Sequence, residues 1–153
     1  METAAIPRIR NLAEESFGAG LFCAESVVLA IAKAQGIDSE ILPKVATAFC
    51  SGMSRTCGTC GALTGAIMGV SLSFGRSTAM DSVQPSYVAT QQLIRAFEKE
   101  FGSRECKELL GGCDLSSPEG QAIFKEHKIG QRCQHITGKA AEIAAIVIVE
   151  NGG

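Results

Sequence analysis

Residues 60–74 read CGALTGAIMGVSLSF, a run without a charged side chain. Its apolar residues fall on every face of a helix, so we expect a helix from about Gly61 to Phe74 that lies buried in a bundle. The run is shorter than the roughly 20 residues that a membrane-spanning helix needs. Gly61, Gly65 and Gly69 lie four residues apart, so they form a small-residue ridge against which another helix can pack closely.

Helical spacing of apolar residues extends to both sides of this run. It predicts helices over about 23–34, 39–49, 86–101, 103–110, 118 onward and 131–149. We expect Ser103 and Ser117 to cap the helices that follow them, and Tyr87 to lie on the inner face of the helix over 86–101. The small residues of 50–60 predict a loop. The β-branched run Ile146–Val149 is also compatible with a strand, although the alanine-rich stretch before it favours a helix.

These patterns predict an all-α fold. The length fits one domain that buries a core without needing disulfides. We therefore expect residues 1–153 to form a single-domain bundle of about five or six helices, with the Gly-rich helix buried at its centre.

Composition excludes several functions. The net charge is −2, there is no Trp and only one Tyr, so nothing indicates a basic groove or a stacking surface for nucleic acid. The N-terminal METAAIPRIR lacks the apolar run of a signal peptide, so we expect a cytoplasmic protein without membrane insertion. No hydrolytic or transferase pattern stands out, and an oxidoreductase-like role stays open.

Seven cysteines remain to be explained: Cys23, Cys50, Cys57, Cys60, Cys106, Cys113 and Cys133. Their odd number and the expected compartment favour metal or redox chemistry over a disulfide framework. Cys57 and Cys60 form a Cys-x-x-Cys pair that can bind a metal or close a disulfide, which makes them candidate catalytic thiols. Because Cys60 precedes a helix, we expect its thiol pKa to be lowered.

We expect four of these cysteines, each from a different predicted helix, to point toward one core: Cys23, Cys60, Cys106 and Cys133. The segment CGALTG at 60–65 resembles the signature of the C_GCAxxG_C_C family, whose members are described as redox-active. The surroundings FCAESVV (22–28), CKELLG (106–111) and RC (132–133) resemble the family's other cysteine positions. The resemblance covers roughly residues 15–148. It implies a small helical redox or electron-transfer protein in which these four cysteines bind an iron–sulfur cluster, with Cys50, Cys57 and Cys113 as additional cysteines of this chain.

Two other functions stay open at this point. A metal-free dithiol protein would use Cys60 as the attacking thiolate and either Cys57 or Cys23 as the resolving thiol. A helical interaction module would hold a structural zinc on the same four cysteines. The sequence identifies no redox partner protein, and the small-residue helix also leaves a homodimer open. His127 and His135 are expected at the surface and not as ligands.

Overall fold

The computed structural model describes residues 1–153 and contains helices but no β-strand. The all-α class is confirmed, although the chain forms more helices than the five or six expected. In chain order the elements are η1 (Thr3–Ala5), α1 (Ile6–Gly18), α2 (Cys23–Ala34), α3 (Ile41–Ala46), η2 (Thr47–Phe49), α4 (Cys50–Arg55), α5 (Gly61–Phe74), α6 (Gln84–Phe101), α7 (Cys106–Leu109), α8 (Pro118–Glu126) and α9 (Gly130–Glu150).

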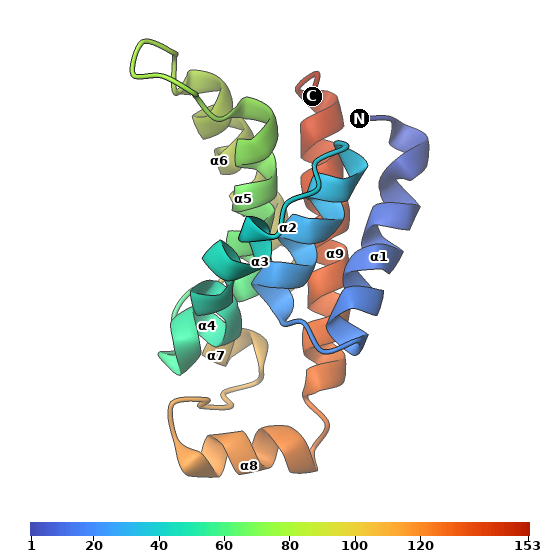
Figure 1. Ribbon diagram of the computed structural model, residues 1–153. Coiled ribbons are helices and arrows are strands. Elements are labelled where there is room, and N and C mark those ends of the chain that lie inside the picture. The colour runs from blue at the N-terminus through green and yellow to red at the C-terminus, as the bar shows by residue number, and fades with distance from the viewer.

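The long helices α1, α2, α5, α6 and α9 pack together, and the short helices α4, α7 and α8 lie near one end of this bundle (Figure 1). Both chain termini lie at the opposite end, where the Met1 ammonium donates a hydrogen bond to the Gly153 carbonyl. The bundle core includes the fully buried side chains of Ile31, Leu63 and Phe97. The short helices α4, α7 and α8 therefore lie at the end of the bundle away from the chain termini.

The predicted glycine ridge packs against α2, as expected. A Cβ atom on Gly65 would lie 2.5 Å from the Ala24 carbonyl oxygen, and one on Gly69 would lie 2.5 Å from Ile31 Cδ1. Only hydrogen fits in such gaps, so the two helices approach more closely than alanine would allow. The lost helix propensity of glycine is offset by this contact.

Several expectations are wrong or incomplete. The helix α1 was not predicted, although its buried Ile9 and Ala13 lie one turn apart. Tyr87 is exposed instead of facing inward. The helix expected after Ser103 begins only at Cys106, because the Ser103 hydroxyl accepts the Glu105 N–H in a separate turn.

Other expectations at the helix ends are confirmed. The Ser117 hydroxyl accepts the Gly120 N–H at 3.0 Å and caps α8. Helix α9 continues through Ile146–Val149, so the alternative of a strand is wrong. No helix combines the length and the apolar character needed to cross a bilayer.

Candidate cysteine site

Four cysteines from four elements line one cavity of about 280 Å³. Cys23 begins α2, Cys60 is the residue before α5, Cys106 begins α7 and Cys133 lies in the first turn of α9. The structure thus brings together the four side chains that the sequence singled out, at the end of the bundle where the short helices lie.

The remaining cavity wall is mainly apolar, with two basic side chains. Phe17, Phe22 and Phe124 contribute aromatic rings, while Arg55 and Lys125 contribute cationic side chains that are exposed to solvent. The lining is therefore mostly apolar, with two solvent-exposed cations.

A short backbone pairing fixes Cys60 next to Cys106. Thr59 and Glu105 form an isolated antiparallel bridge. On its two sides, the Cys60 N–H donates to the Arg104 carbonyl at 2.7 Å and the Cys106 N–H donates to the Gly58 carbonyl at 2.9 Å. Because the two loops are tied by backbone bonds, the two cysteines keep their relative position without a disulfide.

The segment expected as a loop contains α4, which winds with the opposite hand to an ordinary helix. From Ser51 to Arg55 every φ lies between 57° and 66°. Left-handed backbone costs roughly 1–2 kcal/mol for each residue with a Cβ, so this turn is strained. Within it, a Cβ on Gly52 would lie 2.5 Å from Cys106 Cβ and 3.1 Å from its Sγ. The strained turn therefore brings backbone directly against a cavity cysteine.

Cys23 is held by a second close approach. A Cβ on Gly61 would lie 2.4 Å from the Cys23 Sγ atom. The buried Glu25 carboxylate accepts hydrogen bonds from the Phe22 N–H at 2.8 Å and from the Thr47 hydroxyl at 2.6 Å. These bonds cap the first turn of α2 and tie it to η2, so they fix where Cys23 enters the cavity.

Comparison with known proteins identifies the family of this chain. The sequence model of the family described as "Putative redox-active protein (C_GCAxxG_C_C)" matches residues 21–147. The chain belongs to the C_GCAxxG_C_C family. No curated protein and no solved structure matches this chain.

Three cavity thiols of this C_GCAxxG_C_C protein, those of Cys60, Cys106 and Cys133, favour the protonated form at neutral pH. Burial, the largest cause, raises the pKa of Cys60 to about 11, that of Cys106 to about 11 and that of Cys133 to about 12. Neighbouring thiols raise them further: Cys106 acts on Cys60, and Cys57 and Cys113 act on Cys106. The expectation of a lowered pKa for Cys60 is wrong. The N–H groups of the helix start do favour its thiolate, but desolvation outweighs them.

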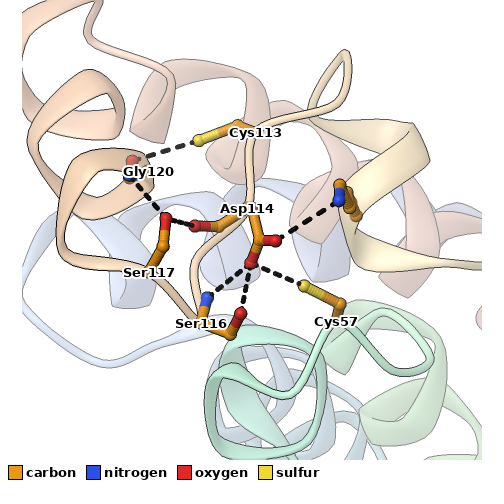
Figure 2. A network of polar contacts seen from close by, with 7 residues as sticks. Cys57, Cys113, Asp114, Ser116, Ser117 and Gly120 are labelled. Atoms are coloured by element: carbon orange, nitrogen blue, oxygen red, sulfur yellow. Dashed lines mark hydrogen bonds and ion pairs between the residues drawn. The ribbon is translucent and has the colours of Figure 1, made fainter.

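Cys57 does not line the cavity with its Cys-x-x-Cys partner. Its thiol donates to the Asp114 carboxylate at 3.1 Å, and the same carboxylate accepts from the N–H and hydroxyl of Ser116 and from Lys107 (Figure 2). These contacts, first those of Ser116 and then that of Cys57, hold the pKa of Asp114 well below its usual range. Cys57 therefore links the loop before α5 to the loop before α8.

The other additional cysteines are buried. Cys113 donates to the Gly120 carbonyl at 3.2 Å (Figure 2), and Cys50 lies in a small apolar cluster with Ala24, Val28 and Ala46. All seven thiols are free in this structure. His127 and His135 are exposed, as expected. No three Cys, His, Asp or Glu side chains lie close enough together to hold one metal ion.

Sequence reasoning missed three residues that shape the site. Gly52 approaches Cys106, the Glu25 carboxylate caps the helix of Cys23, and Asp114 organises the outer loops. Glu25 had a local signal, since a charged residue inside an apolar helical face calls for a buried partner. Gly52 and Asp114 act across long sequence separations, for which the local pattern carries no signal.

Proposed function

We propose that this protein is a redox protein of the electron-transfer type and that Cys23, Cys60, Cys106 and Cys133 hold an iron–sulfur cluster. One observation carries the proposal: four thiols from separate elements line the same cavity of about 280 Å³. Thiolates are the usual ligands of such clusters. In this proposal the Gly-rich α5 is the central helix that carries Cys60 into the site.

The donor set suits a cluster better than a single ion. A structural zinc needs four ligands within about 2.3 Å of one point, whereas no three candidate ligands converge on one point here. The volume of about 280 Å³ is also much larger than the roughly 30 Å³ share of one water molecule. A polyatomic group can reach thiols that are too far apart to share one ion. When bound, such a group would take up and release single electrons.

The residues around the thiols have definable roles. Phe17 and Phe124, which are partly buried, would shield the cavity from water, which lowers the local dielectric and strengthens the electrostatic effect of nearby charges. Arg55 and Lys125 place positive charge at the cavity wall, which would compensate the negative charge of bound thiolates. Since both cations are exposed, they also offer a docking point for an acidic redox partner.

Binding at this site requires the thiols to lose protons. Burial raises the pKa of Cys60 and of Cys106 to about 11, so both are neutral before a metal centre binds. Coordination of a thiol to a metal releases its proton. Loading should therefore be accompanied by proton release and should be weaker at acid pH.

Anaerobic reconstitution tests the proposal. The reduced protein is incubated with ferrous iron and sulfide, desalted, and analysed for bound iron, bound sulfide and visible absorption. We expect stoichiometric iron and sulfide in the wild type and a loss of most of both in Cys60→Ser and in Cys133→Ser. Cys57→Ser is the matched control, because Cys57 belongs to the same Cys-x-x-Cys motif but does not line the cavity. Wild-type protein that stays colourless, or a Cys57→Ser variant that loses as much iron as Cys60→Ser, contradicts the assignment.

A further inference from the structure

Cys50 lies against one of the cavity cysteines. Gly61, the first residue of α5, separates them. A Cβ atom on Gly61 would lie 2.4 Å from the Cys23 Sγ atom and 3.0 Å from the Cys50 Cα atom. Two atoms of the two cysteines therefore flank one glycine. Cys23 also packs against the small apolar cluster that contains Cys50.

This neighbourhood distinguishes Cys50 from the other additional cysteines. The thiol of Cys57 is engaged by Asp114 and that of Cys113 by the Gly120 carbonyl. The Cys50 thiol has only a long contact of 3.8 Å to the Ala46 carbonyl. It also stands at the junction of η2 and the left-handed turn.

We propose that Cys23 and Cys50 form an intramolecular disulfide when the protein meets a small disulfide oxidant such as oxidised glutathione. The Cys23 Sγ atom and the Cys50 Cα atom border the same space, that of the missing Gly61 side chain. A disulfide forms where the two Cα atoms can lie about 4.4–6.8 Å apart. Because Gly61 has no side chain between them, the sulfur atoms can approach each other.

The different exposure of the two thiols sets the order of the reaction. Cys23 is partly exposed and lines the cavity, whereas Cys50 is only 4% exposed. The Cys23 thiolate attacks the oxidant RSSR, forms a mixed disulfide and releases RS⁻, which takes a proton. The Cys50 sulfur then attacks the Cys23 sulfur, and its proton ends on the second RS⁻. Two protein thiols are oxidised, and one RSSR is reduced to two RSH.

The disulfide would regulate the cavity. Once bonded to Cys50, the Cys23 sulfur is no longer a free ligand. This consequence rests on the proposed function, whereas formation of the disulfide does not. Pre-oxidised protein should fail to take up iron and sulfide, and dithiothreitol should restore the uptake.

Peptide mapping tests the disulfide itself in the metal-free, full-length protein. Trypsin places Cys23 alone in residues 11–33 and Cys50 alone in residues 45–55, so a link between these peptides is unambiguous. The reduced protein is treated with 2-hydroxyethyl disulfide, alkylated, digested and analysed by mass spectrometry. We expect the linked pair of peptides, two hydrogens lighter than their sum, and its disappearance after reduction.

Two variants complete the test. In Cys50→Ser, we expect Cys23 to stop at the mixed disulfide and the link to fall to background. In Cys113→Ser, which removes another buried thiol outside the pair, we expect the link to persist. Circular dichroism of both variants shows whether they are folded, and Cys50→Ala replaces Cys50→Ser if the hydroxyl prevents folding. A wild-type Cys23 that remains a mixed disulfide, or that is linked to Cys60, overturns the proposal. If the link forms normally but the reduced protein takes up no iron, only the proposed function is overturned.

Discussion

Single glycines decide where the sulfur atoms of this site lie. Gly61 stands beside Cys23 and Cys50, and Gly52 stands beside Cys106. At each position the neighbouring sulfur or backbone occupies the space that a methyl group would need. The cysteines supply the chemistry, whereas these glycines allow separate elements to deliver the cysteines to one cavity.

Gly61→Ala should destabilise the protein. The added methyl group would lie 2.4 Å from the Cys23 Sγ atom and 2.9 Å from the Phe49 carbonyl oxygen, and the backbone oxygen cannot simply rotate away. Overpacking of this kind costs about 1–3 kcal/mol. Urea unfolding of the reduced protein measures the change in free energy of unfolding.

Gly130→Ala is the control for this change. Gly130 also lines the cavity and begins a helix, but its added Cβ would lie 3.7 Å from the Phe124 ring, which is ordinary contact. We expect no loss of stability, or a gain of up to about 1 kcal/mol from the lower entropy of the unfolded chain. Equal destabilisation by the two substitutions would show that the contact of Gly61 with Cys23 is not the cause.

At the scale of elements, the site depends on two irregular connections. The left-handed turn Ser51–Arg55 and the bridge between Thr59 and Glu105 join α4, α5 and α7. Neither is a regular helix, and both hold backbone against Cys106 or Cys60. Strained backbone persists only where surrounding contacts fix it, and here the contacts come from the cysteine-bearing loops.

Gly52→Ala should cost more than the same change at Gly36. Both glycines have positive φ, +63° and +72°, but a Cβ on Gly52 would lie 2.5 Å from Cys106 Cβ, while one on Gly36 would meet nothing within 4 Å. We expect Gly36→Ala to cost about 1 kcal/mol from backbone strain alone. Gly52→Ala should add about 1–3 kcal/mol from the clash. Urea unfolding measures the free energy of unfolding of both variants. Similar losses of stability would show that glycine is needed at position 52 only for its positive φ and not for the contact with Cys106.

Asp114→Asn should loosen the connection between the loops before α5 and α8. The carboxylate accepts bonds from Cys57, Ser116 and Lys107, and an amide is a weaker acceptor for all of them. We expect iodoacetamide to modify Cys57 several-fold faster at neutral pH, as followed by mass spectrometry. Asp38→Asn, at an exposed carboxylate of another loop, should leave the rate unchanged. Equal rates in wild type and Asp114→Asn would rule out this role.

The sequence predicted the features that depend on local patterns. The bounds of α2, the start of α5 after Cys60 and the Ser117 cap all follow from residues within a few positions of one another. The glycine ridge also has a local period. The Thr59–Glu105 pairing has no such signal, because it joins segments far apart in the chain. The thiol pKa of Cys60 was predicted wrongly because burial is a property of the folded chain.

At the scale of the whole molecule, burial and charge oppose each other. The bundle encloses thiols in an apolar cavity, which favours their neutral form. A cysteine site built this way favours protonated thiols, and in the proposed function a bound metal centre would displace their protons. Between these states, free buried thiolates are unfavourable.

The metal-free, reduced protein should therefore lose stability as the pH rises above about 9. Burial raises the pKa of Cys60 from 9.0 to about 11. A raised pKa in the folded state stabilises the fold below the unfolded pKa, and this contribution is lost as the pH rises toward the folded pKa. For Cys60 alone, a shift of this size corresponds to a loss of about 1 kcal/mol between pH 8 and pH 10. Urea unfolding across this range should give a steeper decline for wild type than for Cys60→Ala, which has no thiol to ionise. Parallel declines would show that Cys60 ionises as easily in the folded as in the unfolded chain.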